Sequence, residues 1–129
     1  MREFNTYKDV VGLMQSYFDG LYHADSKILA DVFHPDARYV NMMEGDYMNY
    51  SRSEYLEIIE QRTSPASQGE QQDDQILSIE FGGSHMAFVK ARMIMMGREY
   101  LDFLTVTFDD GGWKIMSKIF TYNLQKGEA

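Results

Sequence analysis

Chemistry in this chain must come from carboxylates, lysines, tyrosines or histidines, because its 129 residues include no cysteine. Disulfides, thiolate metal sites and cysteine nucleophiles are thereby excluded. Asp102 and Lys118 form the most suggestive pair, since they lie on two strands expected to form the last hairpin. If both face inward, the carboxylate is a candidate general base, and the ammonium can hold an anionic substrate or lower the pKa of the acid. A structural ion pair or two solvated side chains also fit, because alternation alone does not fix the hairpin register.

Two more polar residues lie on predicted apolar faces. Tyr17 is on the apolar side of the first expected helix, where its ring belongs to the core and its hydroxyl needs a partner, either in the protein or in a ligand. Asn41 lies within a predicted strand, and a period of two places it on the same face as Tyr39 and Met43. A buried amide must be hydrogen-bonded, so Asn41 either faces a wet pocket or satisfies the backbone.

The histidines give no sign of a metal centre. His23, His34 and His85 have no ligand spacing such as i, i+4. We therefore predict neither a metal nor an organic cofactor. His34 belongs to a Phe-His-Pro-Asp-Ala turn, where an imidazole commonly bonds the loop backbone, and Trp113 is expected to anchor its hairpin by packing. Five methionines provide adaptable surface that suits an apolar ligand, a core or a dimer face: Met42, Met43, Met93, Met95 and Met96.

The elements that position these side chains change from helical to extended along the chain. Apolar residues three and four apart predict helices over residues 6–24, 27–33 and 54–62. The expected caps are Thr6 with Asp9, then Asp25 or Ser26, then Ser51 or Ser53. Alternating and β-branched runs predict strands over residues 37–43, 47–50, 75–81, 85–97, 98–108 and 113–122. Helices first and a long antiparallel meander second indicate an α+β fold.

Composition indicates one globular domain over residues 1–129, with 44% hydrophobic, 14% aromatic and 25% charged residues. Residues 63–74 have no aliphatic side chain larger than alanine and are expected to form a mobile loop. The net charge of −8 argues against nucleic acid and anionic membranes as partners. No apolar stretch is long enough to span a membrane and no secretory signal is found, so we expect a cytoplasmic protein.

Two segments carry a family resemblance: YFDGLYHADSKILADVFHPDARYV near the front and GREYLDFLTVTFDDGGWKIMSKIFTY at the back. The chain resembles the nuclear transport factor 2-like (NTF2-like) superfamily over nearly its whole length. Within it, the chain is most similar to small bacterial lumazine-binding-like and SnoaL-like proteins, through Asp102-Phe103-Leu104, Gly111-Gly112, Trp113-Lys114-Ile115 and Lys118. The resemblance implies a cone of three N-terminal helices on a strongly curved, mostly antiparallel sheet, with a ligand pocket and a homodimer through the sheet.

The ketosteroid isomerase branch of this superfamily offers a direct test of mechanism. Its catalytic set is a tyrosine on the first helix, an aspartate base on the first strand and a protonated aspartate on a later strand. The resemblance places Tyr17 on the tyrosine, Asn41 on the base and Leu104 on the second aspartate. An asparagine amide cannot accept a proton near neutral pH. We therefore do not expect an isomerase of that mechanism.

Three hypotheses remain, and no catalytic assignment is firm. The first is a pocket for a small, mainly apolar or aromatic molecule. The second is an enzyme of the polyketide-cyclase, dehydratase or isomerase type, with Asp102 as general base and Tyr17 or Lys118 stabilising an oxyanion. The third is a non-catalytic dimeric interaction domain. The expected ligand-binding residues are Tyr17, Tyr39, Asn41, Met43, Asp102, Leu104, Lys118 and Phe120.

Overall fold

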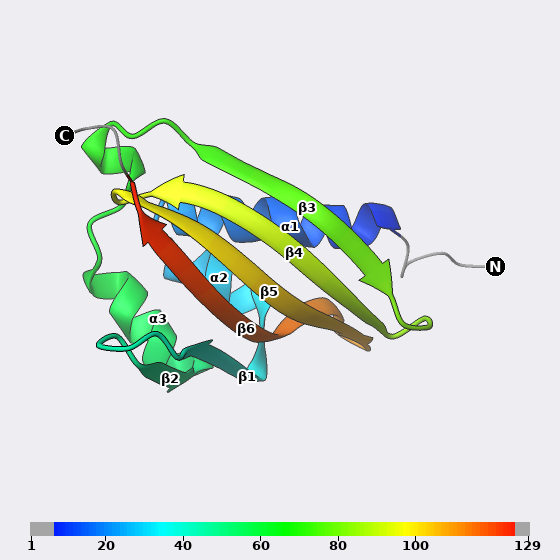
Figure 1. Ribbon diagram of the computed structural model, residues 1–129. Coiled ribbons are helices and arrows are strands. Elements are labelled where there is room, and N and C mark those ends of the chain that lie inside the picture. Colours follow the sequence, from blue (N-terminus) through cyan, green and yellow to red (C-terminus); the bar gives the residue numbers. More distant parts are fainter. Residues whose placement is uncertain (1–6, 126–129) are drawn as a thin grey trace.

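The computed structural model describes residues 7–125 and shows three α-helices and a short 3₁₀ helix with a long, curved sheet (Figure 1). The helices are α1 (Tyr7–Tyr22), α2 (Ser26–Val32), α3 (Arg52–Gln61) and the 3₁₀ helix η1 (Ala66–Gln68). Asp25 caps α2 by accepting hydrogen bonds from the backbone N–H groups of Lys27 and Ile28. Ser51 and Glu54 form a reciprocal capping box at the start of α3. The predicted cap Thr6 lies outside the described residues.

One mixed sheet contains all the described strands. They are β1 (Phe33–Asn41), β2 (Met48–Ser51), β3 (Asp73–Phe81), β4 (Met86–Met95), β5 (Arg98–Asp109) and β6 (Gly112–Leu124). Their order across the sheet is β2-β1-β6-β5-β4-β3. The β1–β6 pair is parallel, and the other neighbouring pairs are antiparallel. The parallel pair brings the first strand of the chain beside the last one.

The start and end of β1 differ from the prediction. Phe33 was expected in the second helix, but it begins the strand and caps α2 with its backbone N–H, because proline two residues later cannot continue a helix. The strand ends at Asn41 rather than Met43. Beyond it the chain turns, with a hydrogen bond from the Asp46 N–H to the Met43 carbonyl and a positive φ of 82° at Gly45.

The helices α1 and α2 pack closely together on one face of the sheet (Figure 1). Gly20 of α1 allows this approach, since a Cβ there would lie 2.7 Å from Leu29 Cδ2 of α2. The buried core between helices and sheet is rich in aromatic rings, including Tyr17, Phe33 and Tyr55. Polar groups on the inner face of the sheet are therefore shut away from water.

A β-bulge in β6 decides which side chains of that strand face this core. Thr105 pairs with Ser117 and Val106 pairs with Ile115, so Met116 is an extra residue without a partner of its own. The extra residue shifts the alternation by one. Ile115 is buried before the bulge, and Lys118 and Phe120 are buried after it. Without the bulge, Lys118 would lie on the opposite face from Ile115.

The segment predicted as a mobile loop, residues 63–74, is hydrogen-bonded to α1 and to the β4–β5 turn. The Tyr22 hydroxyl of α1 donates to the carbonyl of Glu70, and the Glu70 carboxylate accepts from the Met96 N–H in the β4–β5 turn. The segment contains η1, and β3 begins within it at Asp73. Its mobility stays a prediction.

None of the helices in residues 7–125 is long and apolar enough to cross a lipid bilayer.

Candidate functional site

The candidate site is built around Asp102, whose side chain is fully buried on the inner face of β5. Its Oδ2 atom accepts a hydrogen bond of 2.5 Å from the Tyr17 hydroxyl on α1. Its Oδ1 atom has no hydrogen-bond partner among the described residues, although it too is buried. A buried oxygen without a donor is uncommon in folded proteins and calls for a specific explanation. Half of this carboxylate is therefore available to a further group.

Lys118 reaches the same region from β6 and is only 3% exposed. Its Nζ lies 3.9 Å from Asp102 Oδ2, which is ion-pair distance but too long for a hydrogen bond. Lys118 Nζ makes no hydrogen bond to any residue in the described range 7–125. Four rings surround it at 5.0–5.9 Å from Nζ to their centroids, those of Tyr17, Tyr39, Tyr55 and Phe120. The ammonium is held by ring faces and one distant carboxylate.

The strand register explains why these groups meet. Asp102 pairs with Phe120, and Leu104 pairs with Lys118, so acid and amine are diagonal neighbours on one face of the β5–β6 hairpin. The parallel β1–β6 register places Tyr39 beside Lys118 from the other side. Leu104, which pairs with Lys118, is fully buried. The sequence left the hairpin register open, and the fold resolves it with both charges inward.

Burial shifts the pKa of both charged groups toward the neutral pair. The pKa of Asp102 is raised, mainly because burial disfavours the carboxylate, and Lys118 and the Tyr17 hydroxyl oppose this only in part. The pKa of Lys118 is lowered from 10.5 to about 8, again mainly by burial; Asp102 opposes the shift and the Arg62 guanidinium adds to it. Both shifts favour the uncharged form of the group, so the cost of desolvation outweighs the attraction between the charges.

A tyrosine cluster completes the site. Burial raises the pKa of Tyr17, Tyr39 and Tyr55, and Asp102 adds to the shift of each. The Tyr39 and Tyr55 rings stack with centroids 4.0 Å apart. The Tyr55 hydroxyl has no partner in hydrogen-bond geometry within residues 7–125, but the Arg62 guanidinium is near enough to oppose the rise of its pKa. The cluster is a set of neutral phenols beside one carboxyl and one amine.

Sequence reasoning missed Tyr55 of α3 and Arg62, the residue that caps the C-terminal end of α3. A signal was present, because Tyr55 and Ile59 are four residues apart and both are buried on the inner face of α3. Since Tyr55 could be read as an ordinary core aromatic, its position did not identify the site.

Two predicted ligand contacts, Asn41 and Met43, belong to a separate polar cluster at the β1–β2 turn. The side-chain oxygen Oδ1 of Asn41 accepts from the Met43 N–H at 2.8 Å, and the side-chain nitrogen Nδ2 donates to Asp46 Oδ2 at 3.3 Å. Asp46 also accepts from the Tyr122 hydroxyl, and Met43 Sδ accepts from the Tyr122 N–H. Of the two roles left open for Asn41, the structure shows the amide satisfying the backbone. Its contact with a ligand stays untested.

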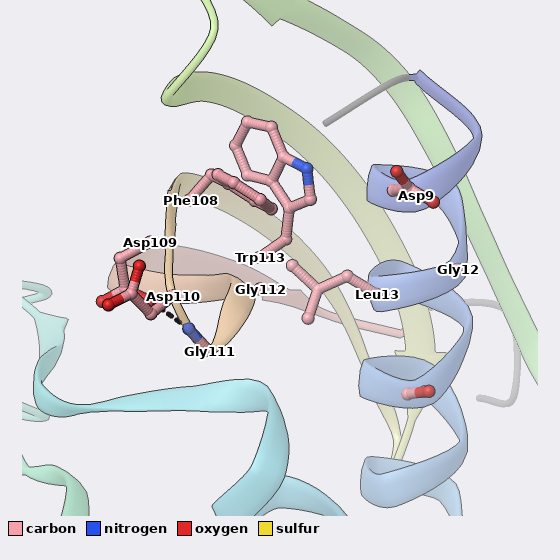
Figure 2. A pocket seen from close by; sticks show the side chains of 10 residues that line it. Asp9, Gly12, Leu13, Phe108, Asp109, Asp110, Gly111, Gly112 and Trp113 are labelled. Atoms are coloured by element: carbon pink, nitrogen blue, oxygen red, sulfur yellow. Dashed lines mark hydrogen bonds between the residues drawn. The ribbon is translucent and has the colours of Figure 1, made fainter. Parts of the chain in front are cut away.

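A surface groove of about 680 Å³ lies between the start of α1 and the β5–β6 turn (Figure 2). Asp109 accepts from the Gly111 N–H and shapes the turn. The buried Trp113 Nε1 has no partner in the described part of the chain. Ser16, Asp109 and Asp110 are exposed, so water can satisfy their polar groups. The lining residues are Asp9, Gly12, Leu13, Ser16, Phe108, Asp109, Asp110, Gly111, Gly112 and Trp113.

We place the candidate site at the Asp102–Lys118 pair rather than in this groove. Buried polar groups without hydrogen-bond partners among residues 7–125 and groups with perturbed pKa values gather between the helices and the sheet, and such groups are typical of functional sites. Trp113 packs against Phe81 and Phe108, in line with the predicted anchoring role. His34 Nδ1 accepts from the Asp36 N–H, a backbone contact of the predicted kind. Within residues 7–125, no three His, Asp or Glu side chains are grouped as metal ligands.

Comparison with known proteins identifies the family. The model of the family described as "Putative lumazine-binding" matches residues 5–121. The chain belongs to this family. A curated relative named "Aldolase FrzH", from Cladobotryum sp, is 28% identical over 116 residues, covering 88% of this chain and 89% of the relative.

Solved structures support the NTF2-like fold. An NTF2-like protein of unknown function from Silicibacter pomeroyi DSS-3 has a TM-score of 0.78 and 24% identity, covering 88% of this chain and 92% of its own. A second, from Shewanella baltica OS155, has a TM-score of 0.78 and 20% identity, covering 92% and 97%. At these identities the likeness shows the fold and leaves the function open.

Proposed function

We propose that the interior of the cone binds a small, mainly apolar or aromatic molecule that carries an oxygen function, and that Asp102, Lys118 and Tyr17 contact that oxygen. The observation that carries the proposal is Asp102 Oδ1, a buried oxygen that finds no donor among residues 7–125, beside a lysine that makes no hydrogen bond to those residues. Each unmet buried polar group costs about 1–3 kcal/mol. A ligand that supplies the missing partners recovers part of that free energy.

The rest of the lining favours an apolar or aromatic ligand. Tyr39 and Phe120 present ring faces to the amine, with centroids 5.0 Å from Nζ. At this distance the ammonium and the ring faces are within the usual range of a cation–π interaction. Ligand pockets of this kind combine apolar walls with a few convergent polar groups.

The relative named as an aldolase favours a carbonyl compound as the ligand. A carbonyl oxygen accepts hydrogen bonds, which an ammonium, a phenol or a protonated carboxyl can donate. Lys118 offers the ammonium and Tyr17 the phenol, and the raised pKa of Asp102 favours its carboxyl form. We therefore include aromatic aldehydes and ketones among the ligands to be tested, beside the lumazines that the family name suggests.

A thermal-shift screen tests this proposal. The panel contains lumazines, flavins, steroids, aromatic acids, aromatic aldehydes and aromatic ketones, and a binder is expected to raise Tm because it stabilises the native state. The Asp102→Asn variant should lose the shift. Asp46→Asn is the matched control, since that carboxylate lies in the β1–β2 turn, and it should keep the shift. The absence of any binder, or an unchanged shift in Asp102→Asn, would contradict the proposal.

Catalysis is the second candidate function, with Asp102 as general base in an enzyme of the polyketide-cyclase, dehydratase or isomerase type. The observation in its favour is that the two carboxylate oxygens differ. Oδ2 accepts a hydrogen bond from Tyr17, and the buried Oδ1 has no partner among residues 7–125 and can accept a substrate proton. Tyr17 or Lys118 would stabilise the oxyanion. Asp102→Asn should abolish turnover with Tm nearly unchanged. Retained turnover in that variant would exclude this role.

The outer face of the sheet is a candidate homodimer surface. Phe103 and Ile119 are paired neighbours on β5 and β6, 42% and 50% exposed. Val40 of β1 extends the row on one side, and Lys90 of β4 lies over the Phe103 ring on the other. Light scattering after size-exclusion chromatography should give a dimer for the wild type and a monomer for Phe103→Glu, with Leu77→Glu on β3 as control. A wild-type monomer at all concentrations would exclude the dimer. A cytoplasmic location is also part of our proposal.

A further inference from the structure

Lys118 has the surroundings of a reactive amine rather than of a structural cation. A structural lysine normally donates hydrogen bonds to carboxylates or carbonyls, as Lys114 does to the carbonyl of Asp31. Lys118 Nζ makes no such bond to any described residue. Its lone contact of opposite charge in that range is Asp102 Oδ2, 3.9 Å away. No strong bond has to break before this nitrogen can act on another molecule.

The same surroundings make the neutral amine accessible near neutral pH. Burial lowers the pKa of Lys118 to about 8, so that about one amine in ten is neutral at pH 7. An ordinary exposed lysine is almost wholly protonated at that pH. A desolvated lysine in an apolar pocket is a known kind of nucleophile toward carbonyl groups.

Groups that can carry protons stand beside the nitrogen. Asp102 Oδ2 is 3.9 Å from Nζ and is itself bonded to the Tyr17 hydroxyl. Asp102 Oδ1 is open. The carboxylate can therefore accept a proton from the amine, and the carboxyl or phenol can return one to an oxygen bound in the site.

We infer that Lys118 forms an imine with the carbonyl carbon of an aromatic aldehyde or ketone bound in the cone, with Asp102 as the proton carrier. The neutral amine attacks the carbonyl carbon, forming the C–N bond while the C=O π electrons move to oxygen. That oxygen takes a proton from the Asp102 carboxyl, and the nitrogen gives its first proton to the resulting carboxylate. Asp102 then protonates the hydroxyl, which leaves as water as the C=N bond forms, and the nitrogen returns its last proton to Asp102. Amine plus carbonyl compound thus gives imine plus one water, and no oxidant or reductant is required.

This inference rests on the proposed function, because the carbonyl compound must first bind beside Asp102. Reductive trapping tests it separately. The full-length protein is incubated with benzaldehyde and then with sodium borohydride, which delivers hydride to the imine carbon and leaves a stable benzylamine. Intact-mass measurement and peptide mapping should show one benzyl group, located on Lys118 and dependent on both reagents.

Two variants complete the test. Lys118→Arg keeps a cation but cannot form this imine, and it should lose the trapped adduct entirely. Lys90→Arg is the matched control on the outer face of the same sheet, and it should be trapped like the wild type. Asp102→Asn should slow trapping at least tenfold while the fold, checked by circular dichroism, is retained. If Lys118→Arg is poorly folded, the peptide map of the wild type alone decides which lysine reacts.

The outcomes separate the two proposals. If benzaldehyde or another aldehyde of the panel raises Tm in an Asp102-dependent way but no borohydride-dependent adduct forms on Lys118, the imine is excluded and the binding site stands. Labelling spread equally over surface lysines would likewise overturn the inference. If no carbonyl compound of the panel binds and none is trapped, the imine proposal is excluded, while binding of the other ligand classes is judged by the thermal-shift screen. Selective labelling of Lys118 would support it.

Discussion

Two buried or half-buried polar clusters in this protein differ in how completely their groups are paired. At the β1–β2 turn, Asn41 uses its carbonyl for the Met43 N–H and its amide for Asp46, which also accepts from Tyr122. Inside the cone, Asp102 has an open oxygen and Lys118 has no hydrogen bond to a described residue. The polar groups of the first cluster are hydrogen-bonded to one another, whereas Asp102 Oδ1 and Lys118 Nζ of the second have no such partner among residues 7–125.

This difference separates a structural role from a functional one. A fully paired cluster lowers the free energy of the fold and fixes a turn. An incompletely paired cluster makes burial of its charges costly, and it persists where the unmet groups serve a ligand or a reaction. Removing a paired group from the first cluster should therefore lower the stability of the fold, and removing an unpaired group from the second should not.

The largest effect is expected from Lys118→Met. The fall of the Lys118 pKa to about 8 corresponds to a cost of roughly 3 kcal/mol for burying the charged form. A methionine of similar length removes this cost, at the loss of the attraction to the rings and to Asp102. We expect the free energy of unfolding at pH 7 to rise by up to roughly 3 kcal/mol, measured by urea denaturation. A loss of stability would show instead that the ion pair is structural.

Asn41→Ala should act in the opposite direction. It removes the partner of the Met43 N–H and one of the two donors to Asp46. The free energy of unfolding should fall by about 1–2 kcal/mol, the cost of leaving such groups unpaired at a half-buried position. Binding of any ligand identified by thermal shift should persist. If ligand binding were lost with the fold intact, Asn41 would have to be counted among the site residues.

The pH dependence of stability sharpens the comparison. Between about pH 8 and 10.5 the unfolded chain keeps the Lys118 proton and the native state releases it, so stability should rise with pH. The contribution is about 1.4 kcal/mol per pH unit for one proton. Asp102, Tyr17, Tyr39, Tyr55 and Arg62 also act on this amine. The raised tyrosine pKa values have the reverse effect above pH 10, where only the unfolded state loses those protons.

The measurement is therefore the difference between wild type and Lys118→Met in urea unfolding from pH 7.5 to 9.5. The free energy of unfolding of the wild type should increase relative to that of the variant as the pH rises. A constant difference would mean that Lys118 keeps its proton throughout this range.

The smallest effect is expected from Tyr55→Phe. Its hydroxyl has no hydrogen-bond partner in residues 7–125, so deleting it leaves nothing unpaired. The free energy of unfolding should change by no more than about 0.5 kcal/mol, so that Tm stays nearly the same or rises slightly. The matched variant Tyr17→Phe removes the donor of Asp102 and should lower Tm. Equal losses in both variants would show that the Tyr55 hydroxyl is paired in solution.

The amino-acid sequence by itself determined most of the secondary structure. Helix spacing, strand alternation and helix caps depend on residues close together in the chain. The structure confirms the helices and strands within a few residues, with Asp25 and Ser51 as the caps. Inward burial of Tyr17 and Tyr39 likewise follows from local periodicity.

Only the tertiary structure decided which polar side chains meet. The bulge at Met116 turns Lys118 inward, and the parallel β1–β6 pair brings Tyr39 beside it. Tyr55 joins from α3, and Asn41 goes to the β1–β2 turn instead. These contacts join residues far apart in the chain and depend on strand register, where a shift of one residue reverses every side chain. A local pattern does not contain that information.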